Sequence, residues 1–186
     1  MQCLRLNIAL WVALAAALPA LADAGGDELA VWKPQHLHFV YMGRTSRYSC
    51  DGLRDKIRAM LLNLGARRDL RIQAIGCEDF GSAMRISGMT PSLYIDVSMP
   101  ALSDSDSKAN HPGDSPAPAH FQPFTITSDV FRNMGVGDCE LVEDFVHQIL
   151  PKLPVRNLKQ EVTCIPHQIS GSHFLVRGEV LRSKTP

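Results

Sequence analysis

The sequence of 186 residues lacks the features that mark the common functional classes. Its 19 basic and 19 acidic residues balance, so no net charge draws the chain toward nucleic acid or a membrane surface. It contains no phosphate-binding loop, no nucleic-acid-binding motif and no G-x-S-x-G elbow of a serine hydrolase. It also lacks a C-x-x-C pair, which argues against a thioredoxin-like redox role. These absences leave a small globular protein without a recognisable catalytic motif.

Long apolar runs are also scarce, and the one that is present lies at the N-terminus. The run from Ile8 to Leu18 follows a positively charged start and precedes small-x-small cleavage sequences that end at Ala24. It is too short to span a bilayer comfortably, and Cys3 precedes it, where a lipid-attachment cysteine would not sit. We therefore predict that residues 1–24 are a removed signal peptide. The mature protein is then periplasmic or secreted, with no membrane span.

The rest of the chain is organised around a repeated pattern. The stretches Cys50 to Cys77 and Cys139 to Cys164 each open with a cysteine and an acid, continue as an amphipathic helix and close with a strand. At a constant offset of 89 residues, five apolar helix positions coincide, namely Leu53, Ile57, Met60, Leu61 and Leu64 with Val142, Val146, Ile149, Leu150 and Leu153. The tripeptide Ile-Ser-Gly recurs after each stretch, at 86–88 and 169–171. We predict two copies of one structural unit.

Four cysteines remain once the signal peptide is removed, and an even number in an exported protein suggests two disulfides. Three connectivities are possible. In a strand–helix–strand unit with parallel strands, the helix begins at the end of the sheet where the second strand finishes. The topology therefore predicts Cys50–Cys77 and Cys139–Cys164, 27 and 25 positions apart. Each closed loop contributes roughly 3.5 kcal/mol in the chain-entropy model.

Hydrophobic periodicity predicts one helix and three strands in each half of the chain. We expect helices from Cys50 to Gly65 and from Cys139 to Leu150, with Ser49 and Asp138 as N-caps. The expected strands are His36 to Met42, Asp69 to Cys77, Ser92 to Met99, Phe121 to Thr127, Asn157 to Cys164 and His173 to Leu181. The predicted fold class is α+β, with two tandem βαββ repeats whose helices pack on one face of a mixed sheet.

Composition sets the predicted domain boundaries. Residues 25–100 form the first repeat, which begins with a polar leader as far as Pro34, and residues 119–186 form the second. Residues 101–118 are rich in proline, serine and aspartate and predict a linker. The halves could form one sheet or two lobes. Complementary charge on the two helices favours one sheet, with Arg54, Lys56 and Arg58 on the first and Glu140, Glu143 and Asp144 on the second.

Three histidines suggest a metal site. His36 and His38 lie on one face of an expected strand, and H-x-H in a strand can supply two ligands to zinc or copper. His120 enters the corresponding strand of the second half and is the candidate third ligand, with Met89 and Met99 as soft ligands for copper. The alternative is that His36 and His38 simply occupy the exposed face of the strand.

Other reactive side chains have structural interpretations that we favour. Cys50 and Cys139 begin helices, where a thiol becomes more acidic, but a disulfide-bonded sulfur is not a nucleophile. Ser87 and Ser170 lie in the repeated Ile-Ser-Gly, which fits a turn. The carboxylates Asp51, Glu78 and Asp79 fit helix-cap and loop positions near the first disulfide. Basic residues in the first half could bind an anion or could be ordinary solvated charges, and they are Arg44, Arg47, Arg67, Arg68 and Arg71.

The run from Tyr48 to Cys77, YSCDGLRDKIRAMLLNLGARRDLRIQAIGC, resembles a signature of small exported proteobacterial proteins of unassigned function. The resemblance rests on Cys50-Asp51-Gly52, the helix, Leu64-Gly65-Ala66-Arg67 and Cys77. It implies a location in the bacterial envelope and brings no catalytic residues.

The function that we predict is an exported, disulfide-stabilised, non-catalytic binding or interaction protein of the bacterial envelope. Its partner would be another protein or a small molecule, not nucleic acid. The alternative is a periplasmic copper- or zinc-binding protein that uses the strand histidines. A hydrolase or thiol enzyme is third.

Overall fold

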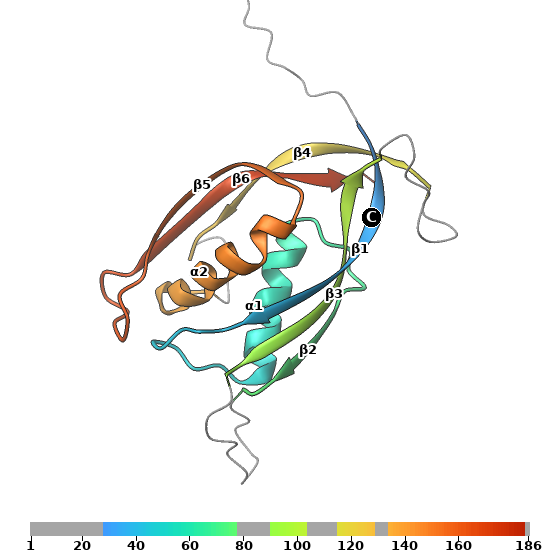
Figure 1. Cartoon of the computed structure of the whole chain (residues 1–186). Helices are drawn as coiled ribbons and strands as arrows, with labels where there is room; N and C mark the ends of the chain where they lie inside the picture. The colour runs from blue at the N-terminus through green and yellow to red at the C-terminus, as the bar shows by residue number, and fades with distance from the viewer. Residues whose placement is uncertain (1–27, 78–89, 104–114, 129–133, 185–186) are drawn as a thin grey trace, which may run out of the picture.

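The computed structural model describes residues 28–77, 90–103, 115–128 and 134–184 (Figure 1). The predicted signal peptide, Glu78, Asp79, Ser87 and Met89 lie outside the described residues, as does most of the predicted linker. The fold class is α+β, with one six-stranded sheet and two helices. The elements are β1 (Glu28–Val40), α1 (Cys50–Asn63), β2 (Arg71–Ile75), β3 (Ser92–Leu102), β4 (Ala117–Ile126), α2 (Cys139–Gln148), β5 (Val155–Thr163) and β6 (His173–Ser183).

The sheet is continuous across the two halves of the chain, in the order β2-β3-β1-β4-β6-β5. The prediction of a mixed sheet is wrong, because all five strand pairings are antiparallel. The physical reason is the position of the last strand of each half. β1 and β2 run in the same direction, as a strand–helix–strand unit requires, but β3 lies between them and pairs with both. β6 separates β4 and β5 in the same way.

The disulfide prediction is confirmed, since Cys50 bonds to Cys77 and Cys139 bonds to Cys164. The topological argument for it holds because β1 and β2 are parallel to each other even though they are not neighbours. The start of α1 therefore lies beside the end of β2, and the start of α2 lies beside the end of β5. The duplication of the whole unit stays a prediction.

The core lies between the helices and the sheet, which curves around both helices (Figure 1). One hydrophobic cluster contains residues from both halves. The five apolar positions that coincide at an offset of 89 are buried in both halves of the chain, with at most 7% of any of the ten residues exposed. The amphipathic pattern therefore identified the buried face of each helix correctly.

The two halves of the sheet meet along a very short seam. β1 pairs with β4 only from Glu28 to Ala30, and the strands then separate. Successive residues of a strand direct their N–H groups to opposite sides, and Tyr41 N–H donates to Pro91 on the β3 side. The backbone N–H groups of the even-numbered residues of β1 therefore point away from β3, toward the gap between β1 and β4. Pro34 is one of these residues, so its missing N–H removes no hydrogen bond from the ladder to β3.

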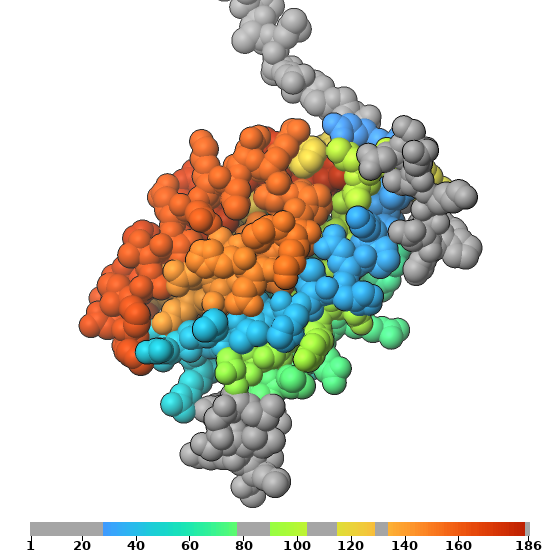
Figure 2. Space-filling view, in the orientation of Figure 1, coloured from blue at the N-terminus to red at the C-terminus, as the bar shows by residue number. Residues whose placement is uncertain are grey.

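Helix α2 lies in this gap beside the C-terminal end of β1. Its side chains form hydrogen bonds with the backbone groups there that no neighbouring strand reaches. Gln148 accepts from Val40 N at 2.8 Å and donates to Val40 O at 2.7 Å. Asp144 accepts from Met42 N at 2.7 Å. Glu140 Oε2 accepts from the backbone N–H groups of Arg44 and Thr45 at 2.6 and 2.7 Å. Figure 2 shows α2, in orange, directly against the blue and cyan chain of β1 and the loop after it.

Glu140, Asp144 and Gln148 are spaced by four residues and so lie on one face of α2, which we call the capping ladder. It takes the place of a neighbouring strand for the end of β1. Complementary charge on the two helices favoured one sheet, which the structure has, but Glu140 and Asp144 accept hydrogen bonds from backbone N–H groups of the β1 end and its loop. Arg54 pairs instead with Asp51 at 2.9 Å, and Arg58 donates to the carbonyls of Leu70 and Arg68.

Two predicted boundaries also need correction. The polar leader is part of β1 from Glu28 onward, and it pairs with β3 as far as Leu102. The predicted linker is correspondingly shorter, since β3 continues through Leu102 and β4 begins at Ala117. Three prolines, Pro34, Pro100 and Pro118, caused both errors because they resemble strand breaks, whereas each occupies a strand position in the sheet.

Candidate functional site

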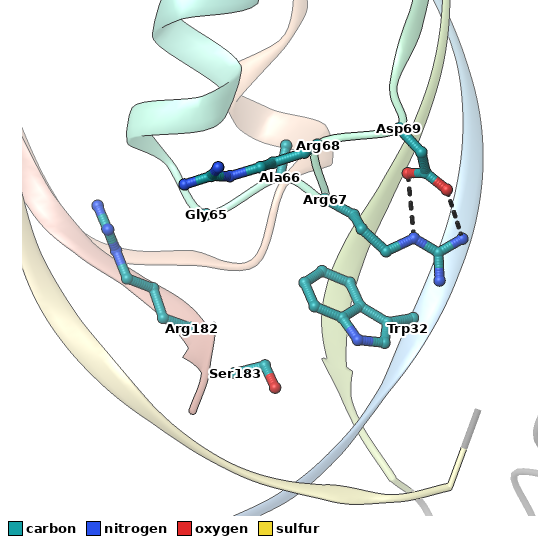
Figure 3. Close-up of a pocket in the computed structure, with 8 residues that line it drawn as sticks. All are labelled: Trp32, Gly65, Ala66, Arg67, Arg68, Asp69, Arg182 and Ser183. Carbon is teal, nitrogen blue, oxygen red and sulfur yellow. Dashed lines mark hydrogen bonds and ion pairs between the residues drawn. The ribbon is translucent and has the colours of Figure 1, made fainter. Parts of the chain in front are cut away.

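A pocket with a volume of about 660 Å³ lies where α1 ends, between β1 and the end of β6 (Figure 3). We call it the Trp32 pocket. Its lining combines one indole ring, three guanidinium groups and one carboxylate, and consists of Trp32, Gly65, Ala66, Arg67, Arg68, Asp69, Arg182 and Ser183. Residues 150 positions apart in the sequence therefore form one site.

The end of α1 determines where the first two arginines lie. Gly65 follows the C-cap Leu64 with a φ of 86°, a left-handed conformation that glycine adopts without strain. Ala66 N–H then donates to Leu61 O at 3.0 Å. Arg67 N–H donates to Ser98 O at 3.0 Å, which ties this turn to β3. The backbone that carries Arg67 and Arg68 is thus attached both to the helix and to the sheet.

Arg67 and Trp32 form one wall of the pocket. The guanidinium group of Arg67 lies 5.8 Å from the centre of the Trp32 ring, within the range of a cation–π contact. It also pairs with Asp69, with Nη2 at 3.0 Å and Nε at 3.1 Å from the two carboxylate oxygens. This two-point pair with Asp69 orients the guanidinium plane against the indole.

Arg182, near the end of β6, forms the facing wall (Figure 3). Its Nη2 donates to Asn63 O in the last turn of α1. Its Nε is buried and has no hydrogen-bond partner among the described residues, and the same is true of Asn63 Oδ1. Burial lowers the pKa of the Arg182 guanidinium. A Cβ on Gly65 would lie 3.1 Å from Arg182 Cγ, so glycine at this position also leaves room for the arginine.

The lining of the Trp32 pocket supplies an aromatic surface and positive charge. The only carboxylate in the lining, Asp69, is engaged by Arg67, and the lining contains no histidine or cysteine. An indole beside several guanidinium groups can contact an apolar surface and hydrogen-bond an anionic group at the same time.

The three histidines of the metal hypothesis lie in different surroundings. His36 Nδ1 is 2.6 Å from Asp96 Oδ1 on the exposed face of the sheet. The His38 ring packs on Tyr94 with centroids 4.8 Å apart. His120 lies on β4, with Nε2 at 2.8 Å from Gln122 Nε2. In the described ranges no group of three or more histidine, cysteine or acidic side chains is placed to hold a metal ion, and Met99 is fully buried in the core.

The cysteine and serine candidates have structural roles. The four cysteines among the described residues are bonded in pairs, which leaves no thiol at the start of either described helix. Ser170 lies in a turn that continues through Gly171, whose φ is 84°. Asp51 is exposed and pairs with Arg54.

Sequence reasoning placed Asp138 correctly as the N-cap residue of α2 but not the role of its side chain. Ser49 does accept from Gly52 N–H in α1, at 3.1 Å. The Asp138 carboxylate is buried, and instead of capping α2 it binds Tyr48 Oη at 2.5 Å, Lys56 Nζ at 2.9 Å and Gly135 N at 2.7 Å. It therefore joins the start of α2 to α1.

Two buried tyrosines accompany this cluster. Burial raises the pKa of the Tyr48 hydroxyl, and the hydrogen bond to Asp138 raises it further. Burial also raises the pKa of Tyr41, with a further contribution from the charge of Glu140. The two rings pack edge to face with centroids 5.0 Å apart. Both hydroxyls are hydrogen-bonded inside the fold, so we assign them to stability and not to chemistry.

Sequence reasoning missed Trp32 and Arg182 as site residues. Trp32 stood in the stretch that was predicted to be a leader, and Arg182 lay beyond the predicted end of the last strand. Arg67 and Arg68 were among the possible anion-binding residues, and both line the Trp32 pocket. The available signal was a tryptophan in an otherwise polar segment, since the chain has only one other tryptophan, Trp11.

Comparison of the chain with protein-family models, curated proteins and solved structures finds no match. Neither of the helices in the described part of the chain is long and apolar enough to cross a membrane. The function has to be argued from the site itself.

Proposed function

We propose that this protein is an exported, disulfide-stabilised, non-catalytic binding protein of the bacterial envelope, and that the Trp32 pocket holds a small-molecule ligand. One observation carries the proposal. A pocket of about 660 Å³ combines an indole wall with a buried guanidinium nitrogen that has no partner in the described protein. Ligand sites of 300–1,000 Å³ that join an aromatic surface with a few polar groups are typical of small-molecule binding.

The export part of the proposal has separate support. Residues 1–24 have the pattern of a secretory signal, and two disulfides fit an oxidising compartment such as the periplasm. The resemblance of Tyr48 to Cys77 to small exported proteobacterial proteins agrees with this location.

We also propose that the two halves arose by duplication of one βαββ unit. The element order β-α-β-β occurs twice, and each half has its disulfide between the start of its helix and the end of its second strand. In this interpretation the helix end of the first half came to line the Trp32 pocket together with Arg182 and Ser183 of the second half, and the helix of the second half acquired the capping ladder.

The test is to identify what the protein carries when it is isolated from the periplasm without denaturation. The protein is then unfolded, and the released small molecules are identified by mass spectrometry. We expect a compound that is present with the native protein and absent from Trp32→Ala. The control is Tyr94→Ala, which removes an exposed aromatic residue of the neighbouring strand and should retain the compound. Loss from both variants, or no difference between wild type and Trp32→Ala, would reject the pocket as the ligand site.

Copper or zinc binding is the second candidate. The observation that bears on it is the carboxylate of Asp96 beside His36, although His36, His38 and Asp96 do not form a group placed to hold an ion in the described ranges. Metal analysis of the purified protein should then find one ion per chain, and the His36→Ala/His38→Ala double variant should lose it. His120→Ala tests the third ligand predicted from the sequence.

A further inference from the structure

We infer that the ligand of the Trp32 pocket is an organic anion, whose phosphate or carboxylate group binds Arg182 and Arg68 while its apolar body contacts Trp32. This inference rests on the proposed function and specifies its ligand class.

Local charge is the first argument. The whole chain is neutral, with 19 basic and 19 acidic residues, but the pocket lining has three arginines and one aspartate. Asp69 is committed to Arg67 at two points, so the charges of Arg68 and Arg182 have no acidic counterpart within the lining. A neutral protein thus concentrates positive charge at the Trp32 pocket.

The hydrogen bonds of Arg182 are the second argument. The bond from Nη2 to Asn63 O explains one nitrogen, since it stabilises the last turn of α1. It does not explain Nε, which is buried and has no hydrogen-bond partner in the described part of the chain. A buried donor is normally satisfied, and the oxygen of an anion is the strongest acceptor for a guanidinium N–H. An anion at Arg182 would also offset the desolvation that lowers the pKa of this side chain.

The geometry of the remaining wall argues for an organic anion and against a simple inorganic ion. The guanidinium groups of Arg68 and Arg182 lie across the pocket from the Trp32 ring (Figure 3). Trp32 is only half-buried and is held by Arg67, so it presents a fixed apolar surface. A volume of about 660 Å³ is much larger than one phosphate group needs. A ligand with an anionic end and a flat apolar body would fill both parts.

The test uses protein lacking residues 1–24, in which Trp32 is the only tryptophan. Its fluorescence is followed on addition of phenylphosphate, benzoate or the neutral benzyl alcohol, at concentrations up to about 10 mM. We expect saturable changes with both anions and a much weaker response to benzyl alcohol. Raising the salt concentration should weaken anion binding, because the charges are partly exposed to solvent.

Variants assign the effect to the pocket. Arg182→Gln and Arg68→Gln should each weaken phenylphosphate binding about tenfold, as expected for loss of one charge-assisted hydrogen bond. Arg68 is exposed, so its replacement keeps the test valid if Arg182→Gln fails to fold. The control is Arg54→Gln, which makes the same charge change on the surface of α1, where Arg54 pairs with Asp51, and should bind as wild type does.

Several outcomes would overturn the inference. Equal responses to benzyl alcohol and phenylphosphate, or no saturable response to either anion, would do so. So would binding to phosphatidylglycerol vesicles without binding to the soluble anions, which would indicate a lipid surface instead. If the natively isolated protein releases a neutral compound that depends on Trp32, the inference fails while the proposed binding function stands.

Discussion

The two halves of the molecule share their strand order and disulfide position but use equivalent acidic residues differently. Residues Glu140 and Asp144 of α2 lie 89 positions after Asp51 and Asp55 of α1. In α2 both acids bind the backbone at the open edge of β1. In α1 both are solvent-exposed, with side chains 78% and 63% accessible, and they pair only with the neighbouring Arg54 among the contacts of the described residues.

The helix ends differ as well. Helix α1 ends at Asn63 and is followed by Gly65, and the turn at Gly65 lines the Trp32 pocket. Helix α2 passes into a short 3₁₀ turn, Leu150–Lys152, that contains Pro151 and leads directly to β5. The apolar faces of the two helices are therefore alike, while the polar positions have separate roles. We expect such a pattern when two similar helices share one core, one supporting the Trp32 pocket and the other binding the open edge of β1.

The largest expected effect comes from the disulfides and compares the two halves directly. Replacing either pair by alanine should lower the free energy of unfolding by roughly 3.5 kcal/mol, because each bridge closes a loop of similar length. Loss of Cys139–Cys164 should cost more than loss of Cys50–Cys77, since Cys139 is 2% exposed and its truncation leaves a core cavity. Denaturant unfolding of both double variants measures the difference. An equal or reversed order would show that the two halves do not differ in this way.

The next effect separates the capping ladder from its counterpart on α1. Glu140→Ala should destabilise the protein by about 2 kcal/mol, because it removes two charge-assisted hydrogen bonds and leaves the N–H groups of Arg44 and Thr45 without their acceptor. The matched control is Asp51→Ala at the equivalent position of α1. It should cost about 0.5 kcal/mol, the contribution of an exposed acid in the first helical turn. Similar losses for the two variants would contradict the division of roles.

A smaller effect concerns the buried tyrosines and alkaline pH. The folded-state pKa values of Tyr41 and Tyr48 are raised above the ordinary 10.0, so the folded protein holds protons that the unfolded chain releases. Their stabilisation is fully present below pH 10 and is lost as the pH rises above it. Each tyrosine should contribute a slope of about 1.4 kcal/mol per pH unit.

Tyr48→Phe should remove about half of that alkaline slope, measured by rapid denaturant unfolding between pH 9 and about pH 11. Tyr94→Phe, at a site 53% exposed, is the control and should leave the slope unchanged. An unchanged slope in Tyr48→Phe would mean that burial and the hydrogen bond to Asp138 do not hold the tyrosine proton in the folded state.

The sequence predicted the parts of the fold that depend on periodicity. Apolar spacing identified both helices and their buried faces, because the spacing follows the helical period. The strand–helix–strand order identified the disulfides, because it places the start of each helix beside the end of the next strand. The sequence did not predict the antiparallel order, because hydrophobic alternation is the same whether β3 lies beside β2 alone or between β1 and β2. Prolines in β1, β3 and β4 were misleading, and in β1 the reason is that the missing N–H of Pro34 would face away from β3.

The candidate site was only partly predictable. Arg67 and Arg68 were visible as basic residues, but nothing local brings them to Arg182, more than 110 residues later. The capping ladder is equally non-local, because Glu140 and Asp144 look like ordinary surface acids until β1 and β4 separate. Polar roles of this kind depend on how the two halves meet, which the pattern of either half does not contain.

The most direct test of the account follows the indole N–H resonance of Trp32 by nuclear magnetic resonance in ¹⁵N-labelled protein lacking residues 1–24. One tryptophan gives one resonance, so the signal reports on the pocket alone. We predict a saturable shift on titration with phenylphosphate, with a midpoint that moves about tenfold higher in Arg182→Gln. A resonance that stays in place while phenylphosphate shifts backbone signals elsewhere would contradict the assignment of the Trp32 pocket as the binding site.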